Sequence, residues 1–144
     1  MILIAHRGNV NGLNPERENT VAYIEEALGQ GYHCEIDIID YDNNQFTLGH
    51  DKDGEKVSTD WLKNNNLWCH AKSYKALEAM IAKGIHCFFH RSDDYTLTSF
   101  GYIWAYPGKT GGQKSIAVHP EKLTPEEVKK FDGVCSDYVE QFRD

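Results

Sequence analysis

The segment from residue 32 to residue 39 reads YHCEIDII, and its alternation of side chains determines the fold that we expect. Side chains on a strand point alternately to its two faces. One face of this segment is apolar and carries Cys34, Ile36 and Ile38. The other face carries two carboxylates, Glu35 and Asp37, which an apolar core does not tolerate unpaired. The segment therefore predicts a strand with one buried face and one face that belongs to a polar site.

Strands and helices alternate along the chain on both sides of this segment. Short apolar runs predict further strands at Ile2–Ala5, Gln45–Gly49, Leu67–Ala71, Ile85–Phe89, Tyr102–Tyr106, Ser115–Val118 and Gly133–Ser136. Apolar residues at helical spacing predict three helices, which are capped by Asn19, Ser73 and Thr124. The strand, helix, strand order of the first half is typical of right-handed parallel crossovers.

The length of the chain limits the architecture. A TIM-type (β/α) barrel usually takes ~250 residues, whereas this chain has 144. Residues 91–120 show no helical period, and they are open to two interpretations, a pair of barrel strands or a lid over the mouth. We therefore expect an α/β fold in one domain from residue 1 to residue 144, a compact TIM-type barrel with several outer helices missing.

Composition indicates which partners and compartments to expect. The formal net charge of -7 disfavours binding to a nucleic-acid backbone, which requires a basic face. No run approaches the ~20 apolar residues of a membrane span, and Met1–Ala5 meets a charged residue too early for a signal peptide. The cysteines lack metal-site or disulfide spacing, and we expect buried free thiols at Cys34, Cys69, Cys87 and Cys135. These features predict a soluble, cytoplasmic protein.

Polar side chains gather at the carboxyl ends of the predicted strands. Ligands bind at this edge in parallel α/β folds, because side chains from separate strands meet there. The polar residues at these strand ends are His6, Arg7, Glu35, Asp37, His50, Asp51, His70, Lys72 and His90. They form the candidate site.

Two kinds of chemistry follow from these residue types. The Glu35 and Asp37 carboxylates point to the same side and favour a divalent cation, Mg²⁺ or Ca²⁺, over zinc. The alternative is that both pair with Lys or Arg. Arg7 can hold a phosphate with two hydrogen bonds, and Lys72 offers a second positive charge. The alternative for both bases is ion pairing with neighbouring carboxylates.

Histidine side chains supply proton transfer near neutral pH, and His6 and His50 are the candidate acid and base. Glu18 is expected to reach a nearby base, while Asn19 is expected to cap the first helix. The aromatic residues at strand spacing are expected in the core rather than in a pocket, and they are Tyr102, Trp104 and Tyr106. No role is assigned to His33, His86 and His119.

The order and spacing of these motifs resemble a known family. The motifs are His6-Arg7-Gly8, Glu18-Asn19-Thr20, Glu35-Ile36-Asp37 and His50-Asp51. They resemble the glycerophosphodiester phosphodiesterase family, within the phosphatidylinositol phospholipase C-like superfamily. The resemblance implies that His6 and His50 are the catalytic acid and base, that Glu35 and Asp37 bind the metal and that Arg7 contacts phosphate.

The chain departs from the family on the next strand. The family has a Glu and a Lys two residues apart there, with the Glu as third metal ligand, whereas this chain has His70 and Lys72. An imidazole can also bind the ion, so His70 is the expected third ligand, although it softens the preference for Mg²⁺ or Ca²⁺. The chain also lacks the inserted substrate-recognition segment that often follows the His-Asp pair in the family.

The resemblance thus implies a metal-dependent hydrolase that acts on a small phosphodiester. Two alternatives stay open, a non-catalytic module that binds a phosphate ligand at the same barrel mouth, and a lyase that releases a cyclic phosphate. The exact substrate, the oligomeric state and the assignment of acid and base to the two histidines are not fixed by the sequence.

Overall fold

A computed structural model describes residues 1–144 of the chain. The strands are β1 (Ile2–His6), β2 (His33–Asp42), β3 (Gln45–Leu48), β4 (Lys56–Val57), β5 (Leu67–Ala71), β6 (Cys87–Phe88), β7 (Tyr95–Leu97), β8 (Ile103–Ala105), β9 (Ser115–Val118) and β10 (Gly133–Ser136). The α-helices are α1 (Val21–Gly29), α2 (Thr59–Leu62), α3 (Tyr74–Ala82) and α4 (Pro125–Val128), and two 3₁₀ helices are η1 (Pro120–Lys122) and η2 (Val139–Phe142). The fold is therefore a mixed α/β fold with few helices, as expected.

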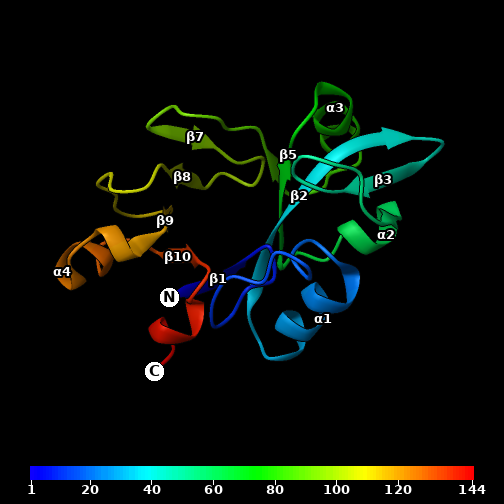
Figure 1. Ribbon diagram of the computed structural model, residues 1–144. Coiled ribbons are helices and arrows are strands. Elements are labelled where there is room, and N and C mark those ends of the chain that lie inside the picture. The colour runs from blue at the N-terminus through cyan, green and yellow to red at the C-terminus, as the bar shows by residue number, and fades with distance from the viewer.

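All ten strands belong to one sheet, and β2 lies at its centre (Figure 1). β2 pairs in parallel with β1 and with β5, and its second half pairs with the antiparallel β3. The parallel sheet continues through β10, β9 and β8 on one side and through β6 on the other. β7 is antiparallel to β8, and β4 extends the β3 hairpin. The carboxyl ends of seven strands consequently lie along one edge.

The sheet does not close into a complete barrel. No ladder joins β6 to β7, and a few separate hydrogen bonds bridge the gap instead. The Ser99 amide donates to the Cys87 carbonyl (2.8 Å), the Cys87 amide donates to Ser99 Oγ (2.9 Å), and Thr96 Oγ1 donates to the Phe89 carbonyl (3.2 Å). Because β6 is only two residues long, side chains replace the backbone ladder there.

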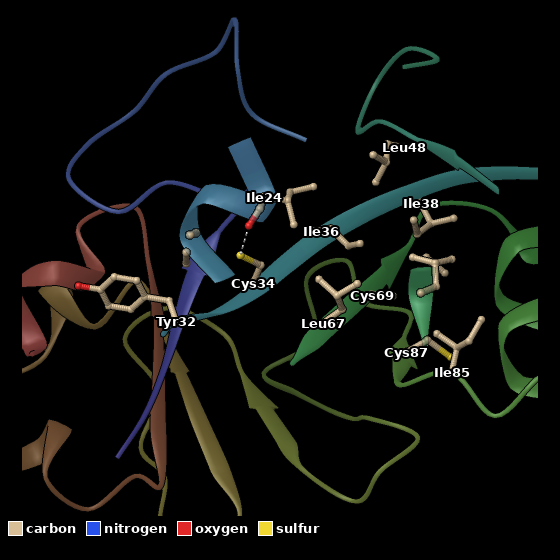
Figure 2. Close-up of a cluster of buried hydrophobic side chains, with 14 of the residues drawn as sticks. Ile24, Tyr32, Cys34, Ile36, Ile38, Leu48, Leu67, Cys69, Ile85 and Cys87 are labelled. Atoms are coloured by element: carbon tan, nitrogen blue, oxygen red, sulfur yellow. Dashed lines mark hydrogen bonds between the residues drawn. The ribbon is translucent and has the colours of Figure 1, made fainter. Parts of the chain in front are cut away.

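The outer face of the sheet packs against the helices and forms the larger core (Figure 2). The apolar face of β2 lies in this core together with Ile24 of α1 and Met80 of α3. Cys34 Sγ donates to the carbonyl of Ile24 at 3.6 Å. All four cysteines are free and buried, which confirms the expectation from the sequence.

A second, smaller core lies on the inner face of the sheet. Its buried members come from six strands and are Ile4, Trp68, Phe88, Trp104, Ile116 and Cys135. The ring of Phe88 on β6 lies 4.6 Å from the ring of Trp104 on β8, centroid to centroid, so the sheet curls around this layer. Two residues further along β1 and β5, on the same face, the chain has His6 and His70. The apolar layer therefore forms the floor of a polar site at the carboxyl ends.

Most predicted elements are present, and the exceptions have identifiable causes. α1 begins after Thr20, whose side chain accepts from the Tyr23 amide at 3.4 Å, so the prediction of Asn19 as the cap was wrong. β4, α2 and β7 were not predicted, because each has at most four residues and no periodic pattern. None of the helices has the length and apolar character that a bilayer crossing requires.

We predict that protonation of His86 destabilises the fold in acid. His86 is buried, its Nε2 bonds Thr98 Oγ1 at 2.8 Å and its ring stacks on Phe100. Burial, together with the nearby His33, lowers its pKa from 6.5 to about 4. The unfolded chain therefore binds a proton at His86 at a higher pH than the folded chain does. The stability contributed by the neutral ring is complete above pH ~6.5 and is lost as the pH falls towards ~4.

The loss should amount to at most about 3 kcal/mol in the free energy of unfolding. Urea unfolding of the wild type and of His86→Phe between pH 7 and pH 4 measures it. The variant keeps the stacking on Phe100 but has no titrating group, so its stability should fall less with pH. Equal pH dependence of the two proteins would contradict the prediction.

Candidate metal and phosphate site

A cavity of about 250 Å³ opens at the carboxyl ends of the strands, above the inner core. Thirteen residues from β1, β2, β5, β8 and β9, and from the loops after these strands and after β3 and β6, line it: His6, Arg7, Glu35, Asp37, His50, His70, His90, Arg91, Trp104, Tyr106, Pro107, Val118 and His119. Seven of the nine strand-end residues of the candidate site therefore meet at one cavity, both candidate catalytic histidines among them, and Asp51 and Lys72 do not line it.

The two carboxylates of β2 are almost completely buried in the floor of this cavity. Glu35 is 2% exposed and Asp37 is 1% exposed. Neither Glu35 Oε1 nor Asp37 Oδ1 has a hydrogen-bond partner. Buried polar atoms without a partner are rare and costly, particularly when they are charged. The floor of the cavity thus has two oxygen atoms that lack a positively charged or hydrogen-bonding ligand.

His70 adds a third candidate ligand atom beside the two carboxylates. Its Nε2 lies 2.9 Å from the carbonyl oxygen of His90, which can only accept, so Nε2 carries the proton. In the neutral ring Nδ1 then has a lone pair, and it lies 3.5 Å from both Glu35 Oε2 and Asp37 Oδ1. Glu35 Oε2, Asp37 Oδ1 and His70 Nδ1 are thus three acceptors that face one another. Either a second proton on His70 or a cation must lie between them.

This arrangement fits a divalent cation. One ligand atom of each residue lies within 4.8 Å of those of the other two. Histidine ligands of metals commonly donate their other ring N–H to a backbone carbonyl, which fixes the ring and the tautomer, and the His90 carbonyl does this for His70. Two carboxylates and one imidazole are ligands that Mg²⁺, Ca²⁺ and Mn²⁺ accept.

The electrostatics of the pair point the same way. Burial alone would raise the pKa of Glu35, whereas a hydrogen bond from a doubly protonated His70, together with the charges of His6, His70 and Arg7, lowers it to about 2. Burial and the adjacent charge of Glu35 raise the pKa of Asp37. The cationic side chains at hand therefore stabilise the charge of Glu35 better than that of Asp37, and with a neutral His70 a bound cation would stabilise the pair further.

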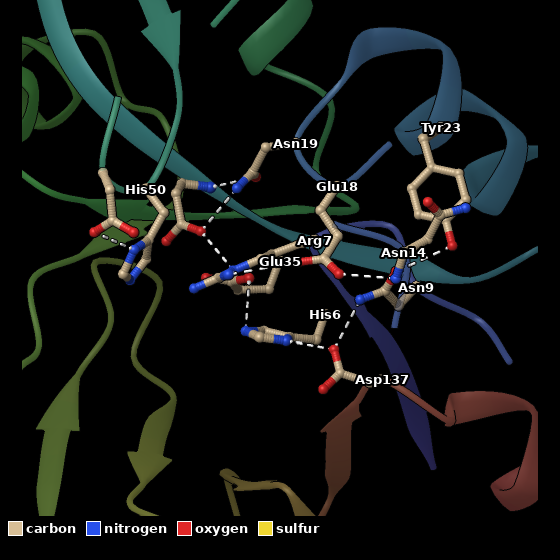
Figure 3. A network of polar contacts seen from close by, with 12 residues as sticks. His6, Arg7, Asn9, Asn14, Glu18, Asn19, Tyr23, Glu35, His50 and Asp137 are labelled. Carbon is tan, nitrogen blue, oxygen red and sulfur yellow. Dashed lines mark hydrogen bonds and ion pairs between the residues drawn. The ribbon is translucent and has the colours of Figure 1, made fainter. Parts of the chain in front are cut away.

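Arg7 and Asn19, both labelled in Figure 3, contact the second oxygen of Asp37. Arg7 Nε lies 3.0 Å from Asp37 Oδ2, and Arg7 Nη1 lies 3.5 Å from Glu18 Oε1. Asn19 Nδ2 donates to Asp37 Oδ2, and Asn19 Oδ1 accepts from the Asp37 amide, both at 3.0 Å. Arg7 and Asn19 have left-handed backbones, with φ of 56° and 59°, which costs energy for residues other than glycine. Asn19 is therefore a positioning residue for Asp37.

His6 is oriented by a residue that the sequence analysis did not include. Its Nδ1 lies 2.7 Å from Asp137 Oδ1, and the same oxygen accepts from Asn9 Nδ2 at 2.9 Å. Nδ1 donates to the carboxylate, so Nε2 is left on the cavity side, 3.8 Å from Glu35 Oε1. Burial opposes protonation of His6, but the hydrogen bond to Asp137 and the charge of Glu35 outweigh it and raise the pKa above 6.5.

His50 stands at the rim of the cavity. The turn before it requires glycine, because Gly49 has a φ of 149° and a Cβ there would collide with the Lys52 carbonyl. The side chain of His50 is 36% exposed, and its Nδ1 bonds Asp51 Oδ1 at 2.9 Å. His50 is therefore more accessible from solvent than His6.

The remaining predicted residues have different positions. Glu18 reaches the base Arg7, as expected, and also accepts from the Asn14 amide at 2.9 Å. Lys72 does not line the cavity and makes no ion pair, and its amide donates to the Ile38 carbonyl at 2.8 Å. The placement of Lys72 as a phosphate ligand therefore gains no support.

Two further residues escaped the sequence analysis although a signal existed. Asp137 directly follows the predicted strand Gly133–Ser136, and His119 directly follows Ser115–Val118. The strand-end rule that selected His6 and His70 would have selected both.

Comparisons of the chain with protein-family models, with curated proteins and with solved structures gave no match.

We predict that Asp37→Asn removes metal binding without destabilising the metal-free protein. The amide oxygen can keep the bonds from Arg7 and Asn19, while Nδ2 takes the place of the unpartnered Oδ1 and donates to His70 Nδ1 or Glu35. Thermal unfolding in a chelator should give a Tm for the variant equal to or above that of the wild type. With Mg²⁺ or Mn²⁺ in excess, only the wild type should gain stability.

The matched control is Asp53→Asn, which changes an exposed carboxylate outside the cavity. It should keep the metal-induced rise in Tm. An equal rise in the Asp37→Asn variant would contradict the assignment of Asp37 as a ligand.

Proposed function

We propose that this protein is a metal-dependent phosphodiester hydrolase, similar to the glycerophosphodiester phosphodiesterases. The proposal rests on three facing acceptors, Glu35 Oε2, Asp37 Oδ1 and His70 Nδ1, and on two buried oxygens without a hydrogen-bond partner, Glu35 Oε1 and Asp37 Oδ1. The motif resemblance of residues 6–51 adds to it. We also infer that the curled sheet is a reduced TIM-type barrel, because its inner layer draws side chains from six strands.

The proposed cation would be held by Glu35, Asp37 and His70. When bound, it would act as a Lewis acid that withdraws negative charge from a phosphate oxygen. Arg7 lines the same cavity and forms ion pairs with Asp37 and Glu18, which hold the guanidinium beside the site. Its permanent charge would stabilise the additional negative charge of the phosphoryl transition state.

His6 is assigned as the general base. Asp137 holds Nδ1–H and thereby leaves the Nε2 lone pair on the cavity side, where it can accept a proton from a water or from a hydroxyl of the substrate. The Asn9 and Tyr23 side chains continue this network, since Tyr23 Oη donates to Asn9 Oδ1 at 3.0 Å. The base is therefore oriented by a chain of buried contacts.

His50 is assigned as the general acid. It lines the cavity and lies at the rim, where a departing alcohol can leave to solvent. Asp51 bonds its Nδ1, which leaves Nε2 to give a proton to the leaving oxygen. A volume of about 250 Å³ lies slightly below the ordinary range of ligand pockets, so a small phosphodiester is the substrate class that fits. Four reduced, buried thiols agree with a cytoplasmic location.

A non-catalytic phosphate-binding module is the second candidate. It is favoured by one observation, the neutral imidazole of His70 where the family has a carboxylate. Such a module would use the same cation and Arg7 but would return its ligand unchanged. A lyase would instead use a hydroxyl of the substrate and release a cyclic phosphate, and phosphorus NMR of the products distinguishes the three outcomes.

We predict that the two histidine variants respond differently to the leaving group. His6→Asn should lose about 10²–10⁴-fold in kcat on both a p-nitrophenyl and an alkyl phosphodiester, because the nucleophile needs a base in either case. His50→Asn should lose a similar factor on the alkyl ester, whose alkoxide must be protonated, and much less on the p-nitrophenyl ester. Steady-state kinetics with Mg²⁺ measures both.

The control variant is His33→Asn, which lies at the other end of the inner face, away from the cavity. It should keep wild-type kcat. Full metal-dependent activity in both His6→Asn and His50→Asn would rule out the proposed acid and base. Binding without turnover in the wild type would favour the non-catalytic module.

A further inference from the structure

The wall of the cavity opposite the metal ligands has no carboxylate. The two acidic residues that line the cavity, Glu35 and Asp37, both belong to β2. The facing wall is built by residues that follow β6, β8 and β9: His90, Arg91, Tyr106, Pro107 and His119. It offers a guanidinium, which only donates hydrogen bonds, and imidazoles and a phenol, which can donate or accept. Its chemistry therefore suits an anion.

Arg91 is an unneutralised cation on this wall. It makes no ion pair with any carboxylate, whereas Arg7 contacts both Asp37 and Glu18. Its guanidinium carbon lies 5.7 Å from the centroid of the Phe89 ring, which supports the side chain from below. An exposed arginine without a carboxylate partner is common on a surface, but this one lines the cavity that also holds the metal ligands.

His119 is held at the same wall by a strained backbone. Its φ of 49° is left-handed, the residue that follows is Pro120, and its amide donates to the Cys135 carbonyl at 2.8 Å. Left-handed residues other than glycine are found preferentially at functional sites. The His119 ring stands edge-on to His6, with centroids 5.1 Å apart. The strained turn thus places a second ring beside the proposed base.

We propose that Arg91 and His119 form an anion-binding subsite that takes a carboxylate on the group esterified to the phosphate. The inference rests on the proposed function, because the first anion is the phosphate held by the cation and Arg7. The divalent ion would neutralise Glu35 and Asp37, and Arg7 would face the phosphate, so that Arg91 is the charge left without a partner. A planar carboxylate matches the fork of donors on a guanidinium. The substrate class is therefore a phosphodiester of a hydroxy acid.

Two ligands of nearly the same size test the subsite by calorimetry with excess Mg²⁺. They are 3-phosphoglycerate, which has a carboxylate, and glycerol 3-phosphate, which has a hydroxymethyl group in its place. The wild type should bind 3-phosphoglycerate roughly tenfold more tightly, the effect of one exposed charge-assisted hydrogen-bond pair. Arg91→Gln and His119→Gly should each reduce this preference and keep the affinity for glycerol 3-phosphate. Glycine at position 119 retains the left-handed backbone.

Arg17→Gln is the control, because Arg17 pairs with Glu26 on the surface and does not line the cavity. It should keep the tenfold preference. Equal affinity of the wild type for the two ligands, or a preference that survives in Arg91→Gln, would overturn the subsite while the phosphate site stands. Failure of the wild type to bind either ligand would overturn the phosphate site and the subsite together.

Discussion

The buried contact of Glu35, Asp37 and His70 is the constraint on which the site depends. Two carboxylates on one face of a strand have oxygen atoms without a partner, and Nδ1 of the imidazole beside them faces two carboxylate oxygens at 3.5 Å, where either a second proton or a cation must lie. Burial of such a group is unfavourable unless a cation joins it. Such an arrangement is what we would expect of the cation site that we propose.

The surrounding structure makes the arrangement rigid. Asn19 and Arg7 hold one oxygen of Asp37, and the His90 carbonyl holds the far nitrogen of His70. Asp137 holds Nδ1 of His6 in the same way. Arg7, His90 and Asp137 follow the ends of β1, β6 and β10, so the parallel sheet brings them together, while Asn19 comes from the loop before α1. The inner aromatic layer beneath them keeps the sheet curled, although the β6–β7 gap leaves it open.

The alternation in β2 made the centre of the site predictable from sequence, because a period of two places Glu35 and Asp37 on one face whatever the tertiary fold. Most strands were predictable from their apolar runs. The contact of Asn19 with Asp37 was not predictable, because an Asn before a helix caps that helix far more often than it reaches a distant strand. The position of Lys72, outside the cavity, depends on where β5 ends. The open sheet depends on the length of β6, which no local pattern encodes.

The most direct test is the location of the ion itself. Crystals grown with Mn²⁺ should show an anomalous difference peak within about 2.5 Å of one oxygen of Glu35, one oxygen of Asp37 and Nδ1 of His70. Nε2 of His70 should still contact the His90 carbonyl. A fully occupied Mn²⁺ elsewhere, with Asp37 and Glu35 bound to arginine or protonated histidine instead, would contradict the account.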